Sequence, residues 1–366
     1  MRDINMKRVL FLLLIFIILA CSQKTEIRKI NGDSITSFEV DKVVKELMDS
    51  ANVTGLCLAI FNENELVYLK TFGYKNKEKN EHFDENSIIS GASFSKVVFT
   101  YIVMQLIQEG VLELDKPLYT YLDKPLPEYE KYQDLANDDQ WKLLTARTCL
   151  SHTTGFPNNS GSGLKIFFKP GTRYAYSGEG IGLLQLIVEN ITSKGIEELA
   201  IEKVFKPLGM DRTSFIWQDR FEDNYAAGHD ILEFPNENFG KWTKADAGGS
   251  LLTTITDYAK FVGAVINSEG LNKSVRDSML SPKIRIKSKH QFPTLSNEIT
   301  DKYDDIELSY GLGWGLFTSP YGNAFFKEGH APGWQNYNVN YIDRKTSIII
   351  MTNSDNGEKI FKDLLE

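Results

Sequence analysis

A serine and a lysine three residues apart, Ser93 and Lys96, have the types and spacing that covalent chemistry needs. They begin a long apolar stretch, 93–109, whose spacing predicts a helix that ends at Gly110. On the first turn of a helix, residues three apart share a face, so the hydroxyl and the amine come within reach. A lysine whose pKa falls below about 10.4 through burial or a nearby cation can accept the serine proton. The pair predicts a nucleophile and its base, although the same spacing could simply cap a helix.

Other segments predict the elements that would position this helix. Apolar spacing predicts helices at 38–48, 182–190 and 196–205 and a short one from Glu358 to the end. Strands are predicted at 55–61 and 66–72, joined by a hairpin at 62–64, and near the C-terminus at 311–317, 336–341 and 347–352. Strands at both ends around a helical middle indicate one sheet completed by the C-terminal part, with a second lobe and a cleft between them.

The first residues predict export. Basic side chains within residues 1–8 precede the apolar run Val9–Ala20, which is shorter than the roughly twenty residues that cross a bilayer. We therefore expect residues 1–20 to be a signal peptide. The Leu-Ala-Cys sequence ending at Cys21 resembles a bacterial lipobox, which makes Cys21 the expected site of lipid attachment and residues 21–36 a polar tether. Ordinary secretion with an incidental cysteine is the alternative.

The composition and charge of the chain limit the fold and the classes of partner that can be expected. The chain has 366 residues, 42% of them hydrophobic, which is enough for a large core. Its net charge of -8 argues against nucleic acid as a partner. Beyond Cys21 only Cys57 and Cys149 remain, so no disulfide scaffold is expected, and a single bridge between them stays open.

No cofactor or metal is predicted. The histidines other than His330 lack the His-x-x-x-His or carboxylate spacing of a zinc site. The segment Gly178–Gly182 has glycines like a phosphate-binding loop but lacks its Lys-Ser/Thr ending, so a tight turn is the better interpretation.

Several ordered segments resemble those of serine β-lactamases and the related class C β-lactamase-like DD-peptidases and esterases, a penicillin-recognising serine hydrolase family. The resemblance implies an α/β (α+β) β-lactamase/transpeptidase-like fold, with an antiparallel sheet flanked by helices, a mainly helical lobe and the active site between them. It places the hydrolase domain at 37–366, with the lobe at about 112–250 inserted between the sheet-forming parts 37–111 and 251–366. The matching segments are 91–96, 110–115, 150–155, 169–210, 247–261, 310–314 and 329–333.

The resemblance also assigns a catalytic tyrosine. The family's Tyr-x-Asn element falls on Tyr176-Ser177-Gly178, which implies that the Tyr176 phenol passes protons between the nucleophile and the leaving group. Gly178 departs from the family asparagine, which puts β-lactam recognition in doubt. A buried core tyrosine is the alternative for Tyr176.

The third family element, Lys-Thr-Gly or His-x-Gly, is expected at His330-Ala331-Pro332, where proline stands in the third place. By this resemblance His330 would hydrogen-bond toward Tyr176 and Ser93, with a structural histidine as the alternative. The oxyanion hole would consist of the backbone N–H groups of Ser93 and Gly333.

These features predict an exported serine hydrolase of the bacterial cell envelope that cleaves an ester or amide through an acyl-enzyme on Ser93. A small molecule or peptide is the expected substrate, and a D-amino-acid peptide or a β-lactam is included. Efficient β-lactam hydrolysis is disfavoured, since His330 and Gly178 both depart from that pattern. An α/β-hydrolase is disfavoured because Ser95 replaces the last glycine of Gly-x-Ser-x-Gly and Lys96 has no role there. The alternative of another class is a non-catalytic binding or regulatory protein.

Overall fold

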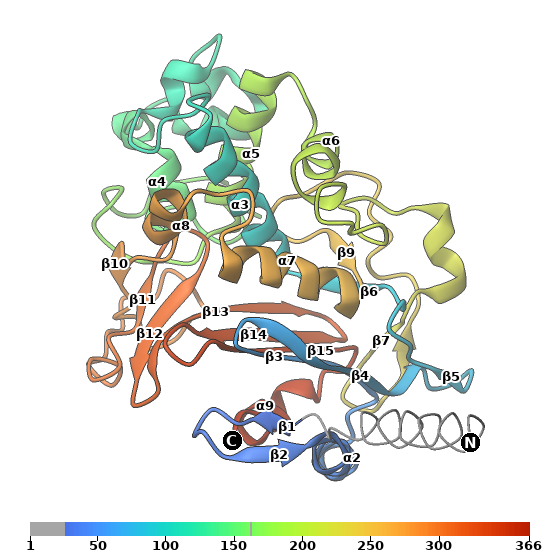
Figure 1. The fold of residues 1–366 in the computed structure, drawn as a ribbon. Coiled ribbons are helices and arrows are strands. Elements are labelled where there is room, and N and C mark those ends of the chain that lie inside the picture. The colour runs from blue at the N-terminus through green and yellow to red at the C-terminus, as the bar shows by residue number, and fades with distance from the viewer. Residues whose placement is uncertain (1–25, 162) are drawn as a thin grey trace, which may run out of the picture.

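A nine-stranded antiparallel sheet forms the centre of the computed structural model, which describes residues 26–161 and 163–366 (Figure 1). The expected signal peptide 1–20, lipid site Cys21 and start of the tether lie outside the described residues. The strand order is β10-β11-β12-β13-β14-β15-β3-β4-β5, so the N-terminal strands complete a sheet begun by C-terminal ones. The strands are β3 (Gly55–Asn62), β4 (Glu65–Asn76), β5 (Glu81–His82), β10 (Ile284–Arg285), β11 (Ser309–Tyr310), β12 (Gly315–Ser319), β13 (Gly322–Ala331), β14 (Trp334–Tyr341) and β15 (Thr346–Thr352).

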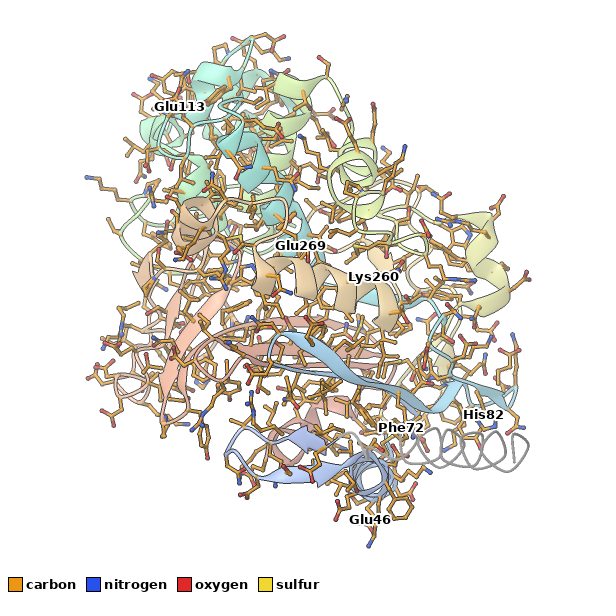
Figure 2. All side chains as sticks on the ribbon, in the orientation of Figure 1. Glu46, Phe72, His82, Glu113, Lys260 and Glu269 are labelled. Carbon is orange, nitrogen blue, oxygen red and sulfur yellow. The ribbon has the colours of Figure 1, made fainter. Side chains whose placement is uncertain are left out.

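Helices cover both faces of this sheet. On one face lie α2 (Ser37–Ala51) and α9 (Phe361–Leu365), and on the other lie α3 (Phe94–Gln108), α7 (Ile255–Asn267) and α8 (Lys273–Met279) (Figure 1). Helix α2 has a polar outer side and an apolar inner side. Figure 2 shows Glu46 pointing outward from α2, whereas Phe72 of β4 belongs to the core between the sheet and α2. Each helix thus buries its apolar side against the sheet.

The helical lobe stands on the α3 side of the sheet. Helix α3 is buried along nearly its whole length because it runs from the sheet into this lobe (Figure 1). An all-round apolar sequence such as that of α3 is typical of a helix covered on every side. The lobe contains α4 (Ala146–Leu150), α5 (Gly178–Thr192), α6 (Ile196–Ala200), a π-helical turn (Ile201–Phe205) and 3₁₀ turns (Leu118–Tyr121, Leu126–Glu128, Glu130–Leu135, Asp139–Leu143 and Asp219–Asn224); another, Gly357–Ile360, precedes α9.

Three small sheets complete the fold. They pair β1 (Glu26–Arg28) with β2 (Ser34–Thr36), β6 (Ile89–Ala92) with β9 (Leu251–Thr253), and β7 (Gly228–His229) with β8 (Pro235–Asn236). The β1–β2 hairpin occupies residues that were expected to be part of the polar tether. Ile27 and Ile30 of this hairpin are buried in the core under α2. Residues 26–36 therefore belong to the folded domain.

The expected antiparallel sheet, helical lobe and α3 are confirmed, and the differences are local. Strand β13 was not predicted, and the expected strand 311–317 begins only at Gly315, after a turn. Cys57 and Cys149 are both free and buried, which decides against a bridge between them, and burial raises the pKa of each thiol. No helix within residues 26–161 and 163–366 is long and apolar enough to span a bilayer.

Candidate active site

The chain turns sharply at the point where the predicted nucleophile lies. Strand β6 ends at Ala92, whose φ of 46° is rare for a residue with a side chain. Ser93 then occupies the N-cap position of α3, but its hydroxyl makes no capping hydrogen bond and is left for other contacts. Ser95 fixes this turn, since its hydroxyl donates to the Ala92 carbonyl at 2.6 Å and accepts the Leu251 N–H of β9 at 2.9 Å. The turn leaves Ser93 partly exposed at the base of a cleft.

Lys96 lies directly beside the serine, as the three-residue spacing predicts. Its Nζ is 3.1 Å from the Ser93 Oγ and donates to the carbonyl oxygen of Gly248 at 2.5 Å. The Lys96 side chain is buried, so its amine is held in one place by these two contacts. The arrangement suits proton transfer between the two side chains.

Tyr176 lies between two lysines. Its hydroxyl is 3.2 Å from the Nζ of Lys327, and the Nζ atoms of Lys96 and Lys327 each lie 5.0 Å from the centre of its ring. Burial raises the pKa of Tyr176, but Lys327 and Lys96 outweigh burial and lower this pKa to about 8. A phenol in this state can exchange protons near neutral pH.

The second lysine, Lys327, was not singled out in the sequence. It lies on β13 in a Lys-x-Gly sequence, Lys327-Glu328-Gly329, three residues before the position expected for the third family element. A side chain at residue 329 would place its Cβ 2.5 Å from the Gly91 carbonyl, so a glycine is needed for β13 to approach the start of α3. Lys327, rather than His330, is therefore the side chain of this strand that contacts Tyr176.

His330 and Gly333 occupy different places from those expected. The His330 side chain is exposed at the rim of the cleft. Gly333 forms the tight turn between β13 and β14 with a φ of 81°, and its N–H donates to Asp355 Oδ1 at 2.7 Å. That N–H is already used, so Gly333 is not an oxyanion donor in this structure.

The open edge of β13 offers a different backbone donor. The two-residue turn after Ala331 closes the β13–β14 ladder with the pair Ala331–Trp334, and pairing with β12 ends at Phe326. Alternate residues of an antiparallel strand direct their N–H groups to opposite sides, so the His330 N–H faces away from β14 toward the open edge. The His330 N–H is therefore not used in the β13–β14 ladder and is left for another acceptor.

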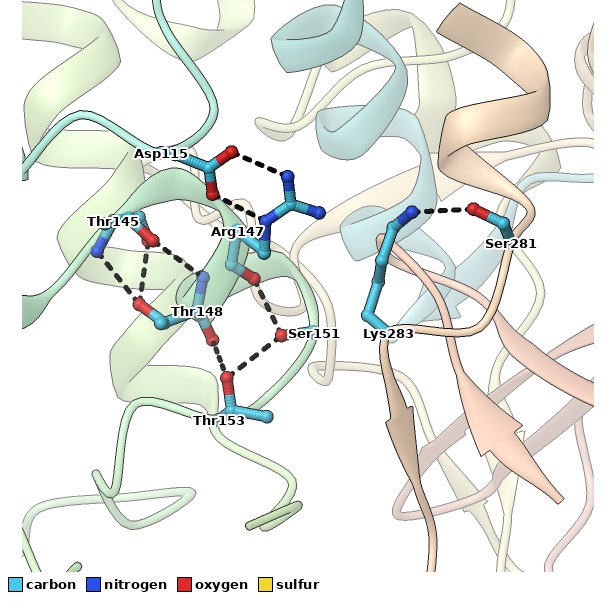
Figure 3. A network of polar contacts seen from close by, with 8 residues as sticks. All are labelled: Asp115, Thr145, Arg147, Thr148, Ser151, Thr153, Ser281 and Lys283. Carbon is cyan, nitrogen blue, oxygen red and sulfur yellow. Dashed lines mark hydrogen bonds and ion pairs between the residues drawn. The ribbon is translucent and has the colours of Figure 1, made fainter. Parts of the chain in front are cut away.

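A network of polar contacts holds α4 and the loop that follows it (Figure 3). Arg147 binds both carboxylate oxygens of Asp115, at 2.6 and 2.7 Å. Ser151 donates to the Arg147 carbonyl at 2.7 Å and contacts the Thr153 hydroxyl at 3.0 Å. These bonds fix both neighbours of His152, whose own φ of 55° is left-handed.

His152 in turn supports the tyrosine. Its ring centre lies 4.3 Å from that of Tyr176, and its Nδ1 accepts the Ser177 N–H at 3.2 Å. Burial, together with Lys327 and Lys96, holds the pKa of His152 well below 6.5, so the ring is neutral with its proton on Nε2. His152 is a positioning residue for Tyr176.

Gly178, the departure from the family pattern, has a steric cause. It begins α5, and its N–H donates to Asn158 Oδ1 at 3.0 Å. A Cβ at residue 178 would lie 2.6 Å from the Asn158 carbonyl oxygen. Asn158 therefore places a carboxamide beside the position where the family pattern has one, and no side chain fits at 178 without moving the chain at 158.

We expect Gly178→Ala to lower the melting temperature, because the added Cβ must displace backbone at a cost of about 1–3 kcal/mol. Gly182→Ala is the matched control in the same helix, since a Cβ there meets only Lys131 Nζ at 3.4 Å. Alanine within a helix is favoured over glycine by about 0.5–1 kcal/mol, so the control should melt at an equal or higher temperature. Calorimetric melting of both variants tests this, and equal stability of Gly178→Ala and the wild type would contradict it.

Ser93, Lys96, Tyr176 and His330 all line one open cleft of about 610 Å³ between the sheet and the lobe. Asn158 and Gly248 also line it. Among residues 26–161 and 163–366, no group of three or more His, Cys, Asp or Glu side chains is arranged to hold a metal ion. The cleft is large enough for a small ester or a short peptide.

A comparison with protein families identifies the family of this chain. The model of the beta-lactamase family matches residues 40–365, nearly the whole described chain. The chain belongs to the beta-lactamase family. Beta-lactamase family members of the serine type, to which the fold and relatives of this chain point, are hydrolases that work through an acyl-enzyme.

Individual relatives are distant. Penicillin-binding protein 4* of Bacillus subtilis is 24% identical over 330 residues, which is 80% of this chain and 66% of that protein. The penicillin-binding protein homologue of Pyrococcus abyssi, described as octameric, superimposes with a TM-score of 0.71 at 21% identity, covering 88% of this chain and 74% of its own. D-alanine carboxypeptidase AmpC of Burkholderia cenocepacia gives a TM-score of 0.70 at 16% identity, covering 89% of this chain and 97% of its own. These structures confirm the β-lactamase/transpeptidase-like fold.

Proposed function

We propose that this chain is a serine hydrolase that cleaves an ester or amide through an acyl-enzyme on Ser93. One observation carries the proposal: the Ser93 hydroxyl lies 3.1 Å from Lys96, next to a tyrosine whose pKa two lysines lower to about 8. A core tyrosine with no chemical role would gain nothing from two buried ammonium groups, which cost free energy to desolvate. The arrangement is the one that activates a nucleophile.

In acylation the Ser93 oxygen attacks the carbonyl carbon while its proton passes to the Tyr176 phenolate, which the charged Lys96 and Lys327 stabilise. The N–H groups of Ser93 and His330 stabilise the negative oxygen that forms. Tyr176 then donates a proton to the leaving alcohol or amine as its bond to the carbonyl carbon breaks. In deacylation Tyr176 takes a proton from water, the resulting hydroxide attacks the ester, and the proton returns to Ser93.

The substrate we favour is an ester or simple amide over a β-lactam. With Lys327 placed beside Tyr176, His330 no longer argues against β-lactams, but two other residues do. Gly178 has no side chain to hold an amide, and the oxygen of the nearby Asn158 carboxamide is already bonded to the Gly178 N–H. Glu328 places a carboxylate in the Lys-x-Gly sequence, where it would repel an anionic substrate. The names of the relatives keep D-alanine peptides among the compounds to test.

The experiment that tests the proposal is acyl-enzyme trapping. The purified protein is mixed with p-nitrophenyl butyrate, quenched in acid within seconds and digested for mass spectrometry. We expect a butyryl group on the peptide that contains Ser93, together with release of p-nitrophenolate. Release without a label on that peptide would contradict the mechanism, and neither release nor label would favour the binding-protein alternative. Benzylpenicillin in the same assay shows whether a β-lactam acylates the same serine.

We also propose that the protein is exported and anchored through Cys21. The basic, apolar and Ala-Cys sequence of residues 1–21 supports this, as the lipid is attached to the cysteine that follows the cleavage site. Cys21→Ser is expected to move the protein from the membrane pellet to the soluble fraction of a bacterial host and to abolish labelling by radioactive palmitate. Cys57→Ser is the control and should keep both membrane association and label. An unchanged membrane fraction for Cys21→Ser would contradict the anchor.

A further inference from the structure

A second cavity adjoins the cleft and has aromatic walls. It has a volume of about 420 Å³, and Tyr176 lines both it and the cleft that contains Ser93. Tyr176 is thus a wall shared by the two spaces, and a substrate held at Ser93 would have to extend past Tyr176 to reach the second cavity. Its aromatic lining residues are Tyr174, Tyr303, Tyr310, Tyr337, Phe317 and Phe326.

One carboxylate enters this aromatic cavity. Glu328 lies opposite Tyr337 on β14 and two residues after Phe326, so strand alternation places all three side chains on one face. The neighbouring Lys327 also lines the cavity, but its amine donates to the Tyr176 hydroxyl. Glu328 is partly buried and lines the cavity. Burial is the main cause that raises the pKa of Tyr174, Tyr310 and Tyr337, and the Glu328 charge adds to it in each case.

Glu328 has no partner for its charge. Over the described ranges 26–161 and 163–366, no hydrogen bond or ion pair involves the Glu328 carboxylate. The two lysines that line the cavity are engaged elsewhere, since Lys289 pairs with Glu298 at 2.8 Å and Lys327 binds Tyr176. A partly buried carboxylate without a partner is costly, and a cation from outside the protein would offset that cost.

We propose that this cavity binds an ammonium group carried by the substrate, with Glu328 as its counter-ion and the aromatic rings around it. Aromatic faces attract ammonium and quaternary ammonium groups, most strongly where water is excluded. The inference rests on the proposed hydrolase function and adds its substrate class: an ester or amide with a cationic substituent. A free carboxylate on the substrate would instead be repelled by Glu328.

Two matched esters test the proposal. One is the p-nitrophenyl ester of γ-trimethylammoniobutyrate, and the other is its carbon isostere, in which a tert-butyl group replaces the trimethylammonium group. Spontaneous hydrolysis is subtracted, and kcat/KM is measured for the wild type, Glu328→Gln and Glu307→Gln. Glu307 is an exposed glutamate near the cavity, so its variant removes the same charge without touching the cavity lining.

We expect Glu328→Gln to lower the ratio of kcat/KM for the cationic ester to that for the neutral ester about tenfold. Glu307→Gln should change this ratio less than twofold. An unchanged ratio in Glu328→Gln, with both esters still hydrolysed, would overturn the cation site and leave the hydrolase proposal standing.

A binding measurement separates the two proposals. Butyltrimethylammonium is titrated calorimetrically into the wild type and into Glu328→Gln, which requires no turnover. Binding to the wild type that weakens about tenfold in the variant supports the site even if neither ester is hydrolysed. Equal binding to both proteins, or none to either, overturns it.

Discussion

Ser93→Ala is expected to lower kcat/KM for p-nitrophenyl butyrate by about 10⁴-fold. The substitution removes the oxygen that forms the acyl-enzyme. Catalytic residues act together, so removal of the nucleophile alone costs nearly as much rate as removal of all of them. Lys96 would then lie beside a methyl group and lose the hydroxyl oxygen to which it donates a hydrogen bond. The measurement is initial-rate kinetics at pH 8 on the wild type and the variant.

The control for this variant is Ser50→Ala on α2, on the far face of the sheet from the cleft. It should retain the wild-type kcat/KM. Melting curves of both variants show whether each is folded. A folded Ser93→Ala protein that turns over the ester at the wild-type rate would remove Ser93 from the mechanism.

Lys327→Met should give the second largest effect, a fall in kcat/KM at pH 7 of about 10²–10³-fold. Methionine is close to lysine in length but carries no charge. With Lys327 gone, the effect of burial is opposed only by Lys96 and by the hydrogen bond with Ser93, so the pKa of Tyr176 rises from about 8. A base works when deprotonated, so the acid limb of kcat/KM against pH should move to higher pH by at least about one unit.

The pH profile separates this role from a purely structural one. Lys203→Met is the matched control, because Lys203 is largely covered and pairs with Glu109 at 2.8 Å outside the cleft lining. Its acid limb should stay where the wild type has it. If Lys327→Met lowers the rate but leaves the acid limb in place, Lys327 does not set the pKa of Tyr176.

Elements with a clear apolar period were predictable from the sequence. The helices at 38–48 and 93–109 and the strands at 55–61 and 347–352 all exist, because each has a face that must be buried. Strand β13 was missed because its sequence is rich in Gly, Asn, Lys, Glu and His, and its pairing with β12 and β14 is what makes it a strand. The hairpin of residues 26–36 was missed because single isoleucines between polar residues give no periodic signal.

The candidate site was predictable where its residues are close in sequence. The pair Ser93 and Lys96 needs only one helical turn, and the structure brings Tyr176 to them as the family pattern implies. Lys327 lies on the missed strand, although its Lys-x-Gly sequence was a visible signal. The expected roles of the His330 ring and the Gly333 N–H were both wrong: Lys327 contacts Tyr176, and the Gly333 N–H binds Asp355. Hairpin register decides which side chains and N–H groups of β13 are available, and register depends on pairing between strands.

The hairpin of residues 26–36 limits how far the folded domain can lie from a membrane that holds the proposed lipid anchor. Four residues separate Cys21 from Glu26, so a lipid on Cys21 would hold the start of β1 within about 18 Å of the bilayer surface. The hairpin and α2 lie on the sheet face opposite the helical lobe (Figure 1). A tether this short would turn the α2 face of the sheet toward the bilayer. The helical lobe, and the cleft between it and the sheet, would then lie on the side away from the lipid.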